Sequence, residues 1–234
     1  MNLKNSLVFT ATYNEAGNIA KLLDKILKLN INTDILIIDD SSPDKTFEII
    51  EKYCQKYSNI TLLKREKKQG LDTAHKYAFN YAKEKNYIKF ITMDADLSHD
   101  PKEIPVILNH LDDYPFVIGS RYMKGGENNM TLSRYILSYL GNIFIKFVLN
   151  LKNSEFTTSY RGFNLNKLEG FNLNDVKSKG YSFFMETIFL LNKSGYKFKE
   201  IPIIFENRTR GYSKIPKVEI FRTFKNVIYL LLKK

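Results

Sequence analysis

The chain has 234 residues, of which 44% are hydrophobic, so it can form one large domain with a proper core, and a disordered protein is excluded. Its formal net charge of +11 predicts an anionic partner, such as a nucleotide, a nucleic acid or an acidic membrane surface. The single cysteine, Cys54, excludes an internal disulfide framework and suits a reducing compartment.

Membrane-spanning segments are not predicted. The apolar run near the N-terminus is very short and breaks at Thr10, which indicates a strand and not a signal peptide. No apolar stretch approaches the roughly 20 residues that cross a bilayer. We therefore expect a protein that is soluble or lies on a membrane surface.

Strand and helix patterns alternate through the first half of the chain. Apolar runs predict strands at residues 6–11, 34–40, 60–63 and 87–93. Between them, apolar residues at helical spacing predict helices that begin near Tyr13, after Pro43 and at about Leu71. This order predicts an α/β fold with a mostly parallel central sheet, helices on both faces, and ligands at the carboxyl ends of the strands.

Polar and acidic residues follow three of these strands, at residues 12–15, at Asp39 and Asp40, and at Asp94 and Asp96. Asp94 and Asp96 alternate along an extended chain, so both can face one ligand. Their oxygens suit a Mg²⁺ or Mn²⁺ ion that is already carried by phosphates. The spacing alone favours a turn and a helix cap, but three such strand ends at one sheet edge favour a metal-bound nucleotide.

Basic residues would have to meet the phosphate charge, because the chain has neither a glycine-rich dinucleotide turn nor a P-loop. Arg121 follows a predicted strand over residues 116–119, and its planar guanidinium matches phosphate oxygens. A second candidate is the loop after a predicted edge strand at residues 198–205, which carries Arg208, Arg210 and Lys214. The Gly- and Asn-rich loop at residues 124–130 either closes over a ligand or has no such role.

Three helices are predicted in the second half. Residues 132–151 are apolar nearly all round, which fits either a buried helix or a lipid-facing surface. The helix over residues 180–191 places Glu186 in apolar surroundings, as a site residue or as half of a salt bridge. Residues 215–234 form a basic amphipathic helix, which either belongs to the same globular unit as residues 1–214 or contacts anionic lipid.

A set of motifs in one order resembles the inverting family 2 glycosyltransferases of the GT-A fold, a Rossmann-like fold of nucleotide-diphospho-sugar transferases. The resemblance is closest to the dolichol-phosphate mannose synthases and related polyprenol-phosphate glycosyltransferases. It covers almost the entire chain through ATYNEAGNI, IIDDSSPDKT, GLDTAHKYAF, ITMDADLSHDP, IGSRY, SEFTTSYRGF, KGYSFFME and NRTRGYSK. The implied domain is a GT-A unit over residues 1–214.

This resemblance implies a role for each matching residue. The base and ribose of the nucleotide would be held by Ala11, Tyr13, Glu15, Ile38 and Asp40. The metal and the diphosphate would be surrounded by Asp94, Ala95 and Asp96, with Asp96 as the direct metal ligand. The donor and acceptor phosphates would be neutralised by Arg121, Arg208 and Lys214, and Arg134 resembles the cation at the start of the acceptor-side helix.

Some positions depart from the family pattern. The sequence has Ala11 in place of Pro, Asp72 in place of Gly, Ser98 and Phe184 in place of Gln, and Glu155 and Thr158 in place of Asp and Gly. These departures leave the reaction class intact. They leave the sugar, the base and the metal geometry open.

The resemblance implies transfer of a hexose from a nucleotide donor, GDP-mannose first and UDP-glucose second, to a polyprenyl phosphate with anomeric inversion. It also implies a peripheral position at the cytoplasmic face of a membrane, with or without an anchoring subunit, and no nucleic-acid partner. A phosphate acceptor needs no general base, because its second pKa near roughly 6 leaves it largely dianionic at neutral pH.

Two alternatives stay open. A family 2 enzyme of surface-polysaccharide synthesis would act on a sugar hydroxyl and would need Glu186 or Glu155 as the base. A non-catalytic domain that binds a nucleotide or nucleic acid is allowed by the charge. Of the histidines, His99 is nearest to the predicted crevice, and His75 and His110 are expected on helix surfaces.

Overall fold

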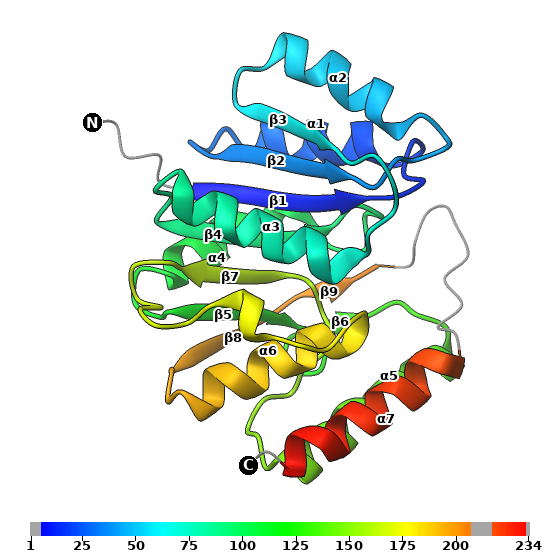
Figure 1. Ribbon diagram of the computed structural model, residues 1–234, viewed down its shortest axis with the longest axis vertical. Helices are drawn as coiled ribbons and strands as arrows, with labels where there is room; N and C mark the ends of the chain where they lie inside the picture. Colours follow the sequence, from blue (N-terminus) through cyan, green and yellow to red (C-terminus); the bar gives the residue numbers. More distant parts are fainter. Residues whose placement is uncertain (1–5, 207–216, 233–234) are drawn as a thin grey trace.

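A computed structural model describes residues 6–206 and 217–232 of the chain (Figure 1). Its centre is a seven-stranded sheet in the order β3-β2-β1-β4-β7-β5-β8. These strands are β1 (Ser6–Thr12), β2 (Asp34–Asp39), β3 (Ile60–Lys64), β4 (Lys89–Asp94), β5 (Phe116–Ser120), β7 (Arg161–Asn164) and β8 (Phe198–Pro202). All neighbours are parallel except β7, which is antiparallel to β4 and β5. The predicted mostly parallel α/β sheet is confirmed, with β8 as an edge strand.

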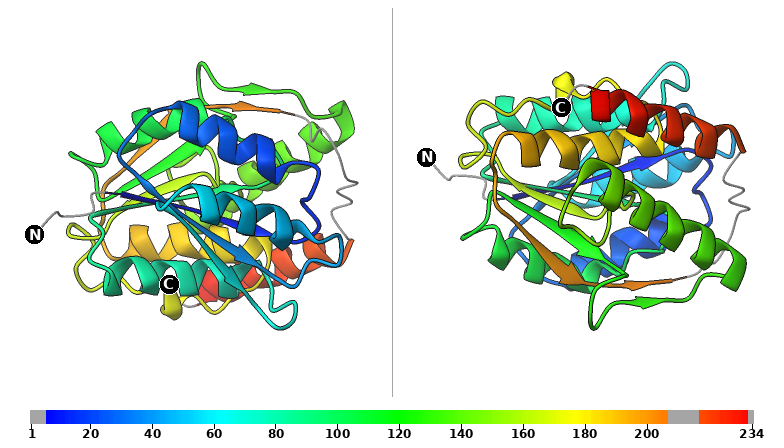
Figure 2. Two further views of the ribbon diagram at one scale, coloured as in Figure 1. Left: turned by 90° about the horizontal axis from the view of Figure 1, so that it is seen from above. Right: turned by 90° about the horizontal axis from the view of Figure 1, so that it is seen from below.

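Helices cover both faces of this sheet (Figure 2). One face carries α1 (Ile19–Lys28), α2 (Thr46–Lys56) and α4 (Ile104–His110), and the other carries α3 (Leu71–Glu84) and α6 (Tyr181–Lys193). Side chains alternate along β1, so that Leu7 and Phe9 join the core under α3 and α6 whereas Val8 joins the core under α1. Because helices cover both faces, β1, β2 and β5 are buried at nearly every position.

The short strand β7 was not predicted, and its first two residues explain why. A charged residue and a glycine are poor signals for a central strand. Arg161 is nevertheless fully buried, with its guanidinium donating to the carbonyl oxygens of Phe156, Thr158 and Phe184. At Gly162, an added Cβ would lie 2.5 Å from Ile107 on α4, so only glycine allows this close packing.

Two helices lie together beyond the β8 end of the sheet, α5 (Leu132–Leu149) and α7 (Lys217–Leu232) (Figure 1). α7 packs against both α5 and α6. The predicted boundary between residues 214 and 215 falls outside the described residues, so the division into two parts stays a prediction.

The helix α5 corrects the expectation that no apolar stretch of the chain is long enough to cross a bilayer. Its 18 residues have a mean hydropathy of 1.2 and 17% of them are buried, so by length and composition alone it could cross a membrane. Large apolar side chains point to solvent along it, with Leu132 72%, Leu140 57% and Phe147 87% exposed. The helix is therefore not simply a buried core element.

Two very short strands, β6 (Glu127–Asn128) and β9 (Ile204–Phe205), pair in parallel beside the main sheet. Their backbone hydrogen bonds link the predicted Gly- and Asn-rich loop to the segment that follows β8. Two 3-10 turns, η1 (Pro101–Glu103) and η2 (Leu173–Asp175), complete the described elements. The pairing of β6 with β9 gives the Gly- and Asn-rich loop a fixed neighbour.

Candidate active site

The ends of three parallel strands meet at one edge of the sheet, as predicted. Ala11 on β1 lies opposite both Ile38 on β2 and Asp94 on β4. Beyond these strands the backbone enters the left-handed region at Asn14, Ser41 and Leu97, with φ of 63°, 58° and 65°. Such residues cluster at functional sites, since the conformation is costly for non-glycine residues.

The acids after β2 hold loops in place. Asp39 is fully buried and accepts hydrogen bonds from the hydroxyls of Thr12 (2.7 Å) and Ser42 (2.6 Å). Asp40 forms a buried ion pair with Arg65 at 3.0 Å and accepts from the backbone N–H of Gly70. The loops after β1, β2 and β3 are thus bonded to one another, and the nucleotide contact assigned to Asp40 stays a prediction.

The residues expected to hold the base and ribose of the nucleotide differ in the solvent exposure of their side chains. The ring of Tyr13 is 39% exposed, and the ammonium of Lys68 lies 3.6 Å from its centre. Glu15 accepts a hydrogen bond from Asn18 at 2.8 Å. Ile38 is 1% exposed and packs in the core, so only its backbone can reach a ligand. Ala11 is half-buried at the same sheet edge.

The Asp-X-Asp pair has one accessible and one buried carboxylate. The Asp94 side chain is 32% exposed and accepts from the Ser159 hydroxyl at 2.6 Å. Asp96 is 3% exposed, and its Oδ1 accepts from the backbone N–H (3.0 Å) and hydroxyl (2.6 Å) of Ser98. Ala95 between them is buried.

A divalent ion fits the oxygen donors of this pair. Hard cations prefer carboxylate oxygens and keep several non-protein ligands when they arrive with phosphates. No cluster of three or more His, Cys, Asp or Glu side chains forms a complete metal site in the described part of the chain. Ligands from a bound diphosphate would therefore be needed beside Asp94 and Asp96.

His99 connects the Asp-X-Asp loop to the segment before β7. The backbone N–H of Asp94 donates to its Nδ1 at 3.2 Å, so the ring proton lies on Nε2, which is 3.1 Å from the Thr158 hydroxyl. The ring stacks on Tyr160 with centroids 5.0 Å apart and meets the edge of Phe205. Burial lowers the pKa of His99 despite nearby carboxylates, so the ring is neutral at neutral pH.

Arg121 lies at the same edge, paired with a fully buried acid. Its Nε donates to the Glu155 carboxylate at 2.8 Å, and its Nη2 donates to the Thr157 hydroxyl at 3.1 Å. The Phe205 ring lies over the guanidinium, with the ring centroid 4.3 Å from Cζ. Burial alone would lower the pKa of Arg121, but the Glu155 carboxylate outweighs it and raises the pKa. Glu200 in turn accepts from the backbone N–H of Glu155.

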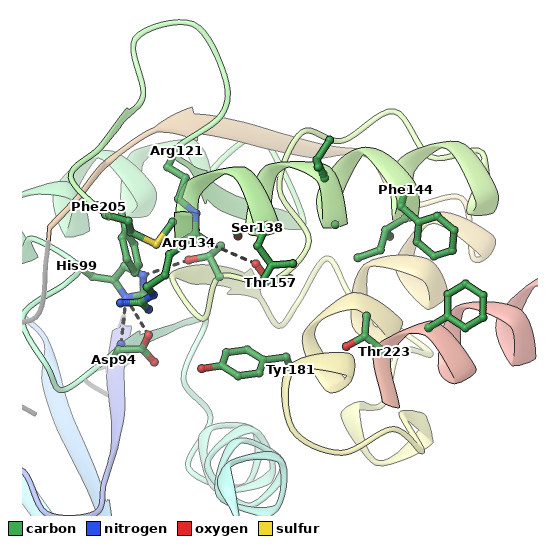
Figure 3. A pocket seen from close by; sticks show the side chains of 17 residues that line it. Asp94, His99, Arg121, Arg134, Ser138, Phe144, Thr157, Tyr181, Phe205 and Thr223 are labelled. Carbon is green, nitrogen blue, oxygen red and sulfur yellow. Dashed lines mark hydrogen bonds and ion pairs between the residues drawn. The ribbon is translucent and has the colours of Figure 1, made fainter. Parts of the chain in front are cut away.

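A cavity of about 340 Å³ opens beside these groups (Figure 3). One end is polar, with Asp94, His99, Arg121 and Arg134. The other end is apolar and runs along α5 to Phe144, whose ring stacks on Phe224 of α7 at 5.5 Å. The Nε of Arg134 is buried and has no hydrogen-bond partner among the described residues. The pocket is thus cationic at its head and apolar along its length.

Comparisons with known proteins match this arrangement to one family. Residues 7–171 match the family described as Glycosyl transferase family 2. The chain belongs to glycosyl transferase family 2. This family 2 chain is 31% identical over 210 residues to the undecaprenyl-phosphate mannosyltransferase of Micrococcus luteus, covering 89% of this chain and 86% of that protein. It is also 31% identical over 215 residues to the polyprenol monophosphomannose synthase of Mycolicibacterium smegmatis, covering 91% and 81%.

A solved structure shares the fold of this family 2 chain. Glucosyl-3-phosphoglycerate synthase from Mycobacterium tuberculosis, in complex with Mn²⁺, UDP and glucosyl-3-phosphoglycerate, superposes with a TM-score of 0.68 at 14% identity. The match covers 98% of this chain and 79% of that one. The predicted GT-A fold is confirmed.

The remaining predicted residues of the family 2 chain are either outside the described residues or outside the pocket lining. Arg208, Arg210 and Lys214 fall outside the described residues. Glu186 is buried and accepts from the backbone N–H groups of Lys177 (3.1 Å) and Ser178 (2.6 Å), so it anchors that segment and does not line the pocket.

The expected surface position of His75 is wrong. The ring is 3% exposed and lies among aromatic rings, including Phe9 and Phe184. Burial, and then nearby Arg161, lower its pKa to about 3. Its place on the amphipathic helix α3 gave no sign that the ring faces the sheet.

The segment before β7 supplies site residues to which the sequence assigned no role. The Thr157 hydroxyl accepts a hydrogen bond from Arg121, and the Thr158 hydroxyl is hydrogen-bonded to His99. The Ser159 hydroxyl donates to Asp94. The one available signal was the run of hydroxyl residues in SEFTTSYRGF, which the resemblance marked as a motif without assigning it a role.

Proposed function

We propose that this enzyme transfers a mannosyl group from a nucleotide donor to the phosphate of a polyprenyl phosphate. One observation carries the proposal, namely a pocket that is cationic beside Asp94 and apolar along α5. A lipid phosphate has the matching chemistry, with an anionic head and a long apolar chain. The names of the two bacterial relatives support the same acceptor class.

The state of the two predicted bases supports a phosphate acceptor over a sugar hydroxyl. Glu155 is fully buried, and its oxygens already accept from Arg121, from the Thr157 hydroxyl and from backbone N–H groups. Glu186 lies outside the pocket lining. A dianionic phosphate is itself the nucleophile, so it needs neither carboxylate.

Each group at the polar end has a part in the proposed reaction. The cations of Arg121 and Arg134 hold the acceptor phosphate and orient one of its oxygens toward the anomeric carbon. Attack from the face opposite the nucleotide inverts that carbon. His99, neutral and bonded on both sides, fixes Asp94 against the segment of Thr158.

The proposed metal is Mg²⁺ or Mn²⁺, held by Asp96 with Asp94 beside it. Such an ion would neutralise charge on the departing nucleoside diphosphate, which is the main electrostatic need of this transfer. The Mn²⁺ in the related glucosyl-3-phosphoglycerate synthase complex supports a divalent ion.

The proposed donor is GDP-mannose, with UDP-glucose second, because both named relatives transfer mannose. The proposed location is the cytoplasmic face of a membrane. The exposed apolar side chains of α5 support direct contact with lipid, so no anchoring subunit is required for the contact itself.

A donor-by-acceptor screen tests the function. The purified full chain would be given labelled GDP-mannose or UDP-glucose with Mn²⁺, together with a polyprenyl phosphate, the matching polyprenol or a free sugar. We expect labelled lipid only with GDP-mannose and polyprenyl phosphate, and none after chelation of the metal. Equal transfer to the polyprenol or to the sugar would contradict the phosphate acceptor.

A further inference from the structure

Gly141 lies in the middle of α5 without a structural reason for being glycine. Elsewhere in the chain, an added Cβ at Gly119, Gly126 or Gly162 would meet atoms within 3 Å, and Gly125 has a φ of +87°. At Gly141, by contrast, the added Cβ would have no atom within 4 Å apart from its chain neighbours and the nearby backbone of its own helix. Glycine is a poor helix former, so a helix interior is an unfavourable place for it unless the space is needed.

The space beside Gly141 belongs to the pocket. The residue lines the cavity between its cationic head and the stacked rings of Phe144 and Phe224. From Arg134 to Phe144 the helix rises about 15 Å, since each residue adds roughly 1.5 Å. Gly141 therefore lines the stretch of the pocket between Ser138 and Phe144, which Figure 3 labels on α5, and a chain leaving the head group passes this stretch to reach the apolar end.

Hydrogen bonds on both sides of Gly141 keep this part of the pocket open. The Ser138 hydroxyl accepts from the hydroxyl of Tyr122 at 2.7 Å. Asn142, which is 3% exposed, accepts from the backbone N–H of Phe156 at 2.8 Å. These bonds attach α5 to the chain around Arg121 and to the segment before β7, so the helix cannot move inward to fill the gap.

We propose that Gly141 is a specificity-determining residue that admits the isoprene units of the acceptor beyond the one next to the phosphate. The inference rests on the proposed function. The phosphate lies at Arg121 and Arg134, and the branched chain passes Gly141 and ends against the Phe144–Phe224 pair. A methyl branch makes each isoprene unit wider than a plain alkyl chain, and the missing side chain supplies that width.

The test uses Gly141→Leu in the full chain. The new side chain enters open space, so the variant folds, and its Tm is expected to equal or exceed that of the wild type. The matched control is Ser133→Leu, which adds the same side chain to an exposed position of α5 outside the pocket. Transfer to farnesyl phosphate and to dimethylallyl phosphate is measured for each protein, along with direct binding of farnesyl phosphate.

We expect Gly141→Leu to raise the KM for farnesyl phosphate at least tenfold and to leave the KM for the nucleotide donor unchanged. Its preference for farnesyl over dimethylallyl phosphate should fall by a similar factor, whereas Ser133→Leu should match the wild type. An unchanged farnesyl KM, or an equal loss with both acceptors, would overturn the inference.

The same measurements separate this inference from the proposed reaction. If the wild type binds farnesyl phosphate without transferring sugar to it, and Gly141→Leu abolishes binding, the chain-binding role stands and the transfer reaction fails. If the wild type neither binds nor uses any prenyl phosphate, both are overturned.

Discussion

At the scale of single residues, the two acids of the Asp-X-Asp pair have different surroundings. Asp94 faces the pocket, whereas Asp96 is buried and bonded to Ser98. Two acids that alternate along the sequence therefore need not have the same solvent exposure. The sequence predicted that both would reach the crevice, and the resemblance gave Asp96 the metal. Neither showed that Asp96 is the more buried of the two, because burial depends on where Ser98 turns the chain.

The substitution Asp96→Asn tests the metal assignment. Asparagine keeps the acceptor for the Ser98 N–H but removes the charge, so the fold should persist while kcat/KM falls by roughly 100-fold or more. The stabilisation of the protein by GDP with Mn²⁺, read as a rise in Tm, should shrink as well. Asp112→Asn, at an exposed acid paired with Lys89, is the control and should behave as wild type. Full activity in Asp96→Asn would rule out this residue as the ligand.

His99 was predicted only as the histidine nearest to the crevice, yet the structure places it between two parts of the site. In His99→Phe, the ring still packs on Tyr160, but the hydrogen bonds to Asp94 and Thr158 are lost. We expect kcat/KM to fall by about 10- to 100-fold with little change in Tm. His99→Asn, whose oxygen can accept from the Asp94 N–H, should recover part of the loss. A fully active His99→Phe would show that this connection is dispensable.

At the scale of elements, the regular alternation of strands and helices was predictable and the exceptions were not. Strands β1 to β5 and helices α1 to α6 follow apolar patterns within their own short stretches of sequence. The strand β7 depends instead on distant contacts, because three carbonyl groups accept from buried Arg161 and α4 packs on Gly162. Local sequence patterns do not predict contacts between residues that are far apart in the chain.

The helix α5 shows the same limit in its exposure. Its sequence fitted a buried helix, with a lipid-facing helix as the alternative, and only its position beyond β8 leaves one side uncovered. The outward side chains, such as Leu140 and Phe147, give the proposed membrane contact a definite face.

That face can be tested with Phe147→Glu. The Phe147 side chain is 87% exposed, so its replacement should leave the Tm unchanged. Binding to anionic vesicles should weaken by about tenfold, since an aromatic side chain is lost from the lipid and a negative charge is added. Flotation of protein with vesicles measures this. Tyr77→Glu, an exposed aromatic of α3, provides the control, and equal weakening in both variants would argue against α5 as the contact.

At the scale of the whole molecule, buried groups with shifted pKa values determine how stability responds to pH. His75 is neutral in the folded protein, because burial lowers its pKa to about 3 from an ordinary 6.5. The unfolded chain binds a proton below pH 6.5 and the folded chain does not. The stability due to this difference is present above pH 6.5 and is lost as the pH falls toward 3.

The free energy of unfolding should therefore fall by roughly 2 kcal/mol between pH 6.5 and pH 5 through His75 alone. In His75→Leu, which keeps an apolar side chain among Phe9 and Phe184, this part of the pH dependence should disappear. Urea unfolding at the two pH values measures it. His110→Leu, at a partly exposed position of α4, is the control and should keep the wild-type slope. An unchanged slope in His75→Leu would contradict the assignment.

The place of β7 between β4 and β5 has a consequence for how this enzyme can be altered. On one side of β7 lie β1, β2 and β4, which carry the residues proposed for the nucleotide and the metal and are encoded before residue 100, and on the other side lies β5, which is encoded after it and leads to Arg121 and α5. The segment entering β7 touches both sides through Ser159 and Thr157. In the proposed mechanism, donor choice therefore depends mainly on the first half of the sequence and acceptor choice mainly on the second. A chimera that exchanges only the first half should acquire a new sugar nucleotide while keeping its lipid, provided that the β7 segment is kept.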